Sequence, residues 1–151
     1  MKWMLLVAIA VGFCAATAAQ AQPHTQSVLQ ALSGQGTGRV EVSPTSYDPG
    51  EATFDVQGTV NIHDVLPNVT FTVLRRVDLI PDGICTGSVW LSLPGSPPPV
   101  LVSSPGGAGA LHFEIARGAP FVDEVKFDVI WRLVGIDGTI LESDCFTVTV
   151  K

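Results

Sequence analysis

From Arg39 to the end of the chain, apolar and polar residues alternate with a period of two. In the segment 52–62 the even positions are apolar apart from Gly58, and their odd neighbours are polar. This alternation is typical of a β-strand with one face in a core and the other in water. Gly58, in the middle of the segment, predicts a bend or bulge in that strand.

The same period recurs in later segments, with turn sequences between them. Positions 69–79 are apolar at most odd numbers, and 125–133 show the clearest alternation in the chain. Pro81-Asp82-Gly83 is a turn signal, and Gly135-Ile136-Asp137-Gly138 is typical of a hairpin. Shorter apolar alternations occupy 40–42, 89–93, 100–102, 111–115 and 146–150.

These segments predict an all-β fold of seven to eight strands. Short strands separated by glycine and proline turns favour two packed antiparallel sheets, a β-sandwich. We expect one shared core, made of Phe54, Val56, Val60, Ile62, Phe71, Val73, Phe127, Val129 and Trp131.

Arg75 conflicts with this pattern, because the parity of its strand places it on the inward face. A buried guanidinium without a partner is unfavourable by several kcal/mol. A guanidinium near the end of the fold that reaches water, or a carboxylate partner, would resolve the conflict. We favour a third solution, a bulge at 74–76 that buries Leu74 and exposes both Arg75 and Arg76.

The N-terminal segment has the order of a secretory signal peptide. Lys2 gives a positive start, Trp3–Ala16 is an unbroken apolar run, and Ala19-Gln20-Ala21 is a small-residue cleavage site. The run is shorter than the roughly 20 residues that a membrane-spanning helix needs. We expect a signal peptide at 1–21, a flexible leader at 22–38 with at most one helical turn, and a β-sandwich domain at 39–151.

This organisation predicts a secreted or periplasmic protein with no membrane insertion after the signal is removed. The formal net charge is −6, from 8 basic and 14 acidic residues, and the chain has no basic cluster. Such a chain repels phosphate backbones and anionic headgroups. The composition therefore disfavours nucleic acid and membrane surfaces as partners.

Cys14 lies in the signal segment, which leaves Cys85 and Cys145 as a pair. In an oxidising compartment an even pair of cysteines predicts a disulfide bond. The alternatives have less support, since two isolated cysteines lack the C-x-x-C spacing of a redox motif.

Candidate metal ligands are few. His63-Asp64, and His112 with Glu114, would suit a transition metal only if their strands adjoined, and no spacing enforces this. Carboxylates gather in turns, where they suit Ca²⁺ or bond the turn backbone; they are Asp78, Asp82, Asp123, Glu124, Asp137, Glu142 and Asp144. Known catalytic and phosphate-binding motifs are absent from the sequence. We expect no catalytic residue, no metal site and no cofactor.

Trp90 is the candidate contact residue. It lies between Val89 and Leu91 and shares its parity with the neighbouring serines, on the face opposite to the apolar set. A tryptophan on the outer surface of a sheet suits contacts with a protein or a glycan. A bulge that turns it inward is the alternative. Trp131, in contrast, shares its face with Phe127 and Val129 and should lie in the core.

The segment 66–73, Leu-Pro-Asn-Val-Thr-Phe-Thr-Val, resembles the Leu-Pro-x-x-x-Tyr-x-Val segment of fibronectin type III and related immunoglobulin-like modules, with Phe71 in the place of the tyrosine. The blocks DLIPDGIC, FEIARGAPF and SDCFTVTVK are similar to small exported proteins of environmental bacteria that have no assigned function. The first resemblance implies an immunoglobulin-like sandwich.

Together these features favour a secreted, non-catalytic β-sandwich module with a binding or structural role and an unknown protein or glycan as its partner. Two alternatives stay open: a small extracellular hydrolase with carboxylates on its loops, and a calcium-stabilised adhesin-like domain.

Overall fold

The computed structural model describes residues 25–48, 50, 53–122 and 124–150, without the side chains of 44–48. Ten strands in this part of the chain form one antiparallel sheet. They are β1 (Thr25–Ser33), β2 (Thr37–Asp48), β3 (Thr53–His63), β4 (Thr70–Asp78), β5 (Leu91–Ser92), β6 (Val100–Val102), β7 (Gly109–Arg117), β8 (Lys126–Gly135), β9 (Ile140–Ser143) and β10 (Phe146–Thr149). No helix among the described residues is long and apolar enough to cross a membrane.

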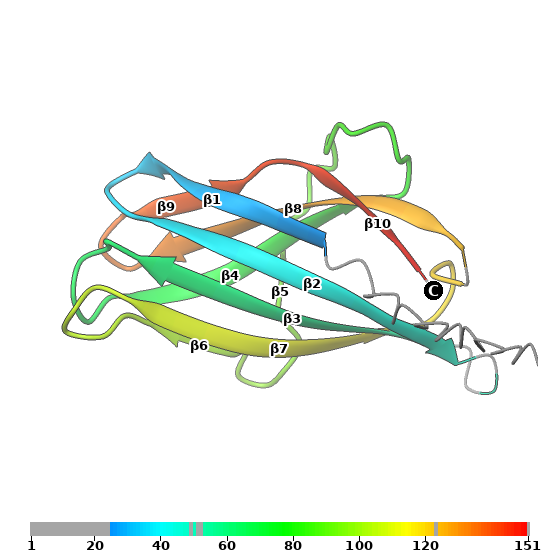
Figure 1. Ribbon diagram of the computed structural model, residues 1–151, viewed down its shortest axis with the longest axis horizontal. Coiled ribbons are helices and arrows are strands. Elements are labelled where there is room, and N and C mark those ends of the chain that lie inside the picture. Colours follow the sequence, from blue (N-terminus) through cyan, green and yellow to red (C-terminus); the bar gives the residue numbers. More distant parts are fainter. Residues whose placement is uncertain (1–24, 49, 51–52, 123, 151) are drawn as a thin grey trace, which may run out of the picture.

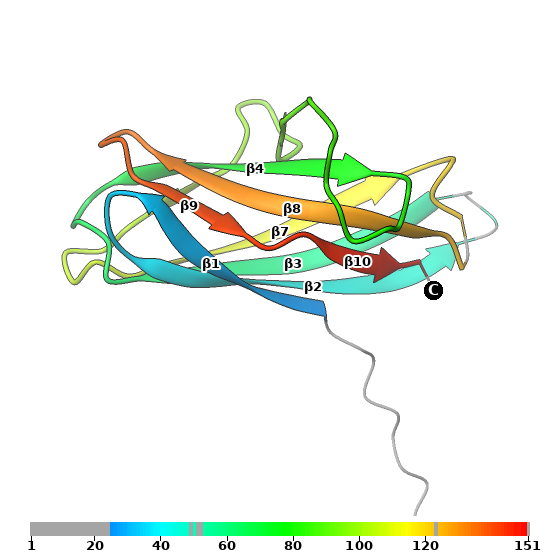
Figure 2. The ribbon, with the colours of Figure 1, turned by 90° about the horizontal axis from the view of Figure 1, so that it is seen from above.

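The sheet is strongly curled into a half-barrel, as Figure 1 shows. Its hydrogen-bonded order is β5-β4-β8-β9-β1-β2-β3-β7, with β10 on β8 and β6 on β4. Seen from above, β4 and β8 form one layer and β2, β3 and β7 form the facing one (Figure 2). The path ends at β5 and at β7, and β7 lies in contact with β6. We call the line between β7 and the edge strands β5 and β6 the seam.

The predicted all-β fold is confirmed, but the strand number was too low. Ten strands are present, and all are connected by hydrogen bonds in one sheet. The expected division into two separate sheets is not confirmed. The physical reason is β9, which pairs with β8 on one side and with β1 on the other and so joins the two layers.

The core lies between the two layers. All nine residues predicted to share it are buried in one apolar cluster. Aromatic rings pack at its centre: the Phe113 and Trp131 centroids are 4.9 Å apart, and Phe127 meets Phe121 edge to face at 5.0 Å. The alternation along the strands therefore predicts the inward faces correctly, and Trp131 lies in the core as expected.

The predicted flexible leader is wrong for residues 25–38. Thr25–Ser33 form β1, and β2 begins at Thr37. β1 pairs with β2 on one side and with β9 on the other, so its backbone hydrogen bonds are satisfied although its side chains are mostly polar. Of its apolar residues only Leu29 is fully buried, which is why the sequence shows little strand signal there. The predicted signal peptide at 1–21 lies outside the described residues.

Gly58 does not mark a bulge. β3 pairs with β7 in an unbroken register from Phe54 to Ile62, and Gly58 lies opposite Phe113. A β-carbon at Gly58 would overlap the Phe113 ring. The glycine is therefore required by the close approach of a core ring to the β3 backbone, not by a bend of the strand.

The predicted bulge at 74–76 is also wrong. β4 pairs with β8 in regular register from Phe71 to Asp78, so the parity of the strand is kept. Arg75 is enclosed, with 4% of its surface exposed, while Leu74 lies on the outer face and is half-buried. Sheet hydrogen bonds on both sides of β4 hold the regular register, since Arg75 also pairs with Leu91 of β5.

The predicted strand at 89–93 is reduced to Leu91–Ser92. Val89 is mostly exposed and Leu93 is buried, so the three apolar residues of that segment do not share one face. The segment before β5 instead belongs to a long loop that packs on the outside of the sheet (Figure 2).

Candidate functional site

An apolar cavity of about 110 Å³ lies inside the curled sheet near the seam. Its walls come from both layers, with Phe54 and Ile115 on one side and Phe127 and Trp131 on the other. Leu91 of β5 and Arg117 of β7 also line it, and both are partly exposed. Because these strands are the two ends of the sheet, the cavity reaches the surface along the seam.

Arg75 brings a cation into this cavity. Its Nη1 donates a hydrogen bond of 2.7 Å to the carbonyl oxygen of Ser92, and its Nη2 has no partner among the described residues. Burial, and then the positive charge of Arg117, lower the pKa of Arg75 to about 10. Arg75 remains charged at neutral pH, so the cavity contains an incompletely paired guanidinium.

Two further residues with polar groups line the same cavity. The indole N–H of Trp131 finds no acceptor within the described part of the protein, although the residue is almost fully buried. Arg117 donates from Nη1 to the carbonyl of its neighbour Ala116 at 2.8 Å. Among the described lining residues there is no carboxylate, so their polar side-chain groups are donors only.

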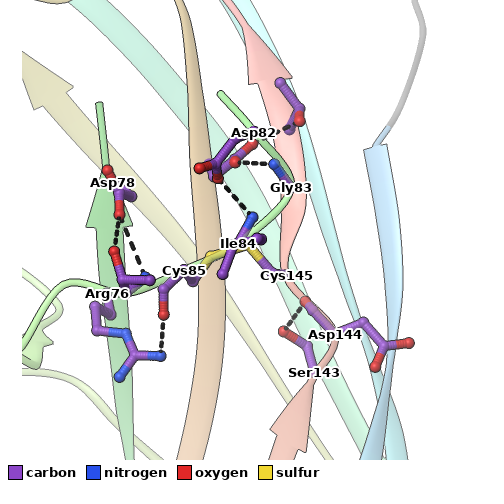
Figure 3. Close-up of a disulfide and its surroundings, with 12 residues drawn as sticks. Arg76, Asp78, Asp82, Gly83, Ile84, Cys85, Ser143, Asp144 and Cys145 are labelled. Carbon is purple, nitrogen blue, oxygen red and sulfur yellow. Dashed lines mark hydrogen bonds between the residues drawn. A yellow bond between two sulfur atoms is a disulfide. The ribbon is translucent and has the colours of Figure 1, made fainter. Parts of the chain in front are cut away.

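A second feature is the loop 79–90, which packs on the outer face of β4, β8 and β10. Figure 3 shows the disulfide that ties it to the strand junction between β9 and β10. Cys85 and Cys145 are bonded, with Cα atoms 5.7 Å apart, so the predicted disulfide is confirmed. The backbone N–H of Gly83 donates to Oδ2 of Asp128 at 2.6 Å.

Asp128 explains how the loop is held. By parity it lies on the outer face of β8, opposite Asp78 of β4, yet none of its surface is exposed because the loop covers it. Its second oxygen accepts a hydrogen bond from the Thr147 hydroxyl. Asp78 accepts hydrogen bonds from both the backbone N–H and the hydroxyl of Thr86, farther along the loop. The hydrogen bond from the Ile80 N–H, followed by those from Thr86, lowers the pKa of Asp78.

Trp90 lies at the end of this loop, just before β5, and is half-buried. The guanidinium carbons of Arg76 and Arg132 are 4.9 and 4.2 Å from its ring centre. Arg132 also pairs with Glu142 of β9. Trp90 therefore anchors the loop through cation–π contacts, and its role in contacting a partner stays a prediction.

The outer face of β2, β3 and β7 carries a shallow polar groove of about 720 Å³ beside the 93–99 loop. In it, Thr59 and His112 are hydrogen-bonded at 2.8 Å, and Gln57 donates to Glu114 at 3.2 Å. These contacts lie within the sheet surface and leave no convergent set of groups. The groove is a weaker candidate than the interior cavity.

The two predicted histidine positions are not brought together. His63 is the last residue of β3 and bonds Asp64 at 2.9 Å. His112 of β7 lies opposite Thr59, which precedes His63 by four residues on β3. No group of three or more His, Cys, Asp or Glu residues is placed to hold a metal ion in the part of the chain that the structure describes.

Among the described turn carboxylates, Asp82 and Asp137 bond their own turns. Asp82 accepts from the N–H of Ile84, and Asp137 accepts from both the N–H and the hydroxyl of Thr139. Burial raises the pKa of Asp137, but the Thr139 hydrogen bonds outweigh it and the pKa is lowered. Asp123 lies outside the described residues.

Sequence reasoning missed two residues of these features. Arg117 follows Phe113 and Ile115 at the inward parity of β7, so the alternation could have placed it in the interior. Asp128 gives no such signal, because its burial depends on a loop that is distant in sequence. Comparisons with protein-family models, with curated proteins and with solved structures found no significant match to this chain.

Proposed function

We propose that the protein is an exported, non-catalytic binding module that takes a small molecule into the cavity inside its curled sheet. The observation that carries the proposal is Arg75, a buried guanidinium with an unpartnered Nη2 in an otherwise apolar cavity. Buried polar groups in proteins are nearly always hydrogen-bonded, so we take the unpaired donors of two residues that line this cavity as a sign of an absent acceptor. Concave, mainly apolar sites with a few placed polar groups are typical of small-molecule sites.

Binding is favoured over catalysis by the chemistry of the cavity wall. Its described lining holds apolar side chains and two arginines, and it includes no nucleophile and no group that acts as a base at neutral pH. Export is supported by the charged and apolar N-terminal segment and by the disulfide, which is compatible with an extracellular or periplasmic protein.

We also propose that the fold is a variant of the immunoglobulin-like sandwich. The segment Leu66–Val73, which resembles fibronectin type III, leads into β4, and Phe71 is fully buried where the family has its tyrosine. The facing layers would then correspond to the two sheets, with β9 as the bridge between them.

A second candidate function is contact with a protein or glycan through the loop 79–90. This loop is fixed by a disulfide and several hydrogen bonds, yet Ile80 and Ile84 on it are 66% and 60% exposed. Apolar side chains held rigidly at a surface suit a partner contact. Trp90, next to them along the chain, would be part of that surface.

The cavity proposal is tested by NMR titration of the exported protein with butyrate, butyramide and butylamine, following the indole N–H resonance of Trp131. Binding of at least one compound should shift this resonance and raise the melting temperature. Val77→Phe, which places a ring at a half-buried cavity wall, should abolish the shift, whereas Val28→Phe on the exposed face of β1 should not. If none of the three compounds moves the Trp131 resonance, the cavity is not a binding site.

The two alternatives are separated by other measurements. A calcium-stabilised domain would lose melting temperature in the presence of a chelator, which the proposed module should not. A hydrolase would release product from a glycan or ester substrate, and substitution of loop carboxylates such as Asp82 or Asp137 would lower the rate of that release.

A further inference from the structure

The charges around the interior cavity indicate which class of ligand it takes. Arg75 comes from β4, the strand that carries the edge strands β5 and β6. Arg117 comes from β7, on the other side of the seam. Both arginines are among the residues that line one small space whose other walls are apolar. Two like charges in a poorly solvated site disfavour each other, and an anion between them would relieve both.

The hydrogen-bonding groups agree with an anion. Nη2 of Arg75 is buried and unpaired, and the Trp131 indole N–H is a second donor without an acceptor among the described residues. A carboxylate accepts hydrogen bonds on two oxygens, and guanidinium–carboxylate bonds are among the strongest that proteins make. A neutral or cationic head group would leave the arginine charges uncompensated.

The size of the cavity limits the apolar part of the ligand. A CH₂ or CH₃ group takes about the volume of one water molecule, about 30 Å³. The cavity volume of about 110 Å³ therefore holds about four such groups of the ligand. Phe54, Phe127 and Ile115 provide the apolar contact for them. A larger body would have to extend out along the seam.

We infer that the cavity binds a short monocarboxylate of about four carbon atoms in all, with its carboxylate against Arg75, its charge balanced also by Arg117, and its apolar chain inside the curled sheet. This inference rests on the proposed binding function and adds the ligand class to it. Arg75 is the residue that recognises the carboxylate, and Arg117 adds long-range attraction from the opposite edge of the seam.

The test compares three compounds of nearly equal shape that differ in charge: butyrate, butyramide and butylamine. With the wild-type protein, butyrate should bind at least tenfold more tightly than butyramide, and butylamine should not bind. Arg75→Met should remove the preference for butyrate, and Arg117→Met should weaken butyrate binding without abolishing it. Arg39→Met, at an exposed position of β2, is the matched control and should leave all three affinities unchanged.

The outcomes separate the inference from the function on which it rests. If butyramide binds as tightly as butyrate, or if Arg75→Met keeps the preference, carboxylate recognition is wrong while the cavity remains a binding site. If butyrate binds equally well to Val77→Phe, the ion is held elsewhere on the surface and the inference fails. If no compound binds the wild-type protein, both the inference and the proposed function fail. Far-ultraviolet circular dichroism of each variant checks that the fold is retained.

Discussion

Arg75 and Arg117 face one interior cavity from the two sides of the seam, and no carboxylate stands between them among the described lining residues. Burial and the nearby charge of Arg117 lower the pKa of Arg75 to about 10. A fold that needed Arg75 only for stability would gain by replacing it with an apolar side chain. We therefore link Arg75 to the proposed ligand recognition, since functional residues are often placed at a cost in stability.

Arg75→Met should keep or increase stability. The substitution removes a buried charge that has one hydrogen bond, and it fills the same space with an apolar chain. Replacement of buried charged groups by apolar residues is often neutral or stabilising by about 1–4 kcal/mol. Urea unfolding at pH 7 measures the change, with Arg39→Met as the control. A loss of stability larger than about 1 kcal/mol would show that the bond to the Ser92 carbonyl outweighs desolvation.

Phe127→Ala should lower the free energy of unfolding by about 3–5 kcal/mol. Phe127 is buried on β8 and packs against Phe54 and Phe121, so its removal leaves a cavity among rings that cannot collapse easily. Denaturant unfolding followed by circular dichroism measures the loss. Val28→Ala, at a half-exposed position, should change stability by less than about 0.5 kcal/mol. Equal effects of the two substitutions would contradict the assigned core.

Gly58→Ala should destabilise the protein although alanine is ordinarily neutral on a strand. The added β-carbon would overlap the ring of Phe113, and that ring is itself stacked near Trp131. Forced overpacking of this kind typically costs about 1–3 kcal/mol. Gly106→Ala is the matched control, since a β-carbon there meets nothing closer than 3.7 Å. The double change Gly58→Ala with Phe113→Leu should restore part of the loss, and its failure to do so would contradict the proposed clash.

Alternation along the strands was sufficient to predict the core, because each inward position of a regular strand is set by its neighbours. The same rule places Arg75 inward and Leu74 outward, and a bulge would avoid both the buried charge and the leucine on the polar face. The structure keeps the register and buries the charge. The general preference for solvated arginine is real, but here the hydrogen bonds of the β4 ladder and the Ser92 carbonyl hold the side chain inside.

Other features depend on contacts between distant segments, which local patterns do not encode. β1 is a strand because β2 and β9 flank it, although only Leu29 among its residues is fully buried. Asp128 is buried because the loop 79–90 folds back over β8. Trp90 lies in a loop, and the two arginines over its ring come from β4 and β8, far from it in the chain.

Loss of the disulfide should destabilise the fold and release the loop. Cys85 and Cys145 are separated by 60 residues, so the bond restricts the unfolded chain by about 4 kcal/mol in the chain-entropy description. The double variant Cys85→Ser with Cys145→Ser should lose about that much, and a reductant should lower the stability of the wild type but not of the variant. Amide exchange of the Gly83 N–H should then rise more than that of core amides in β8. Unchanged exchange at Gly83 would show that the hydrogen bonds and cation–π contacts hold the loop without the disulfide.

Acid should loosen the same loop through Asp78. Hydrogen bonds from the Ile80 N–H and from Thr86 hold the pKa of Asp78 below 3.8, the value expected in the unfolded chain. A carboxyl group with a lowered pKa in the folded state stabilises the fold fully above the unfolded value, and this contribution is lost as the pH falls through the folded pKa. Asp78→Asn should therefore be less stable than wild type at pH 7, and the difference should shrink below pH 3.8. Asp144→Asn, which removes an exposed carboxylate near the disulfide, controls for the change in net charge. A stability difference between Asp78→Asn and wild type that stays constant from neutral to acid pH would rule out the ionised Asp78 as the tether.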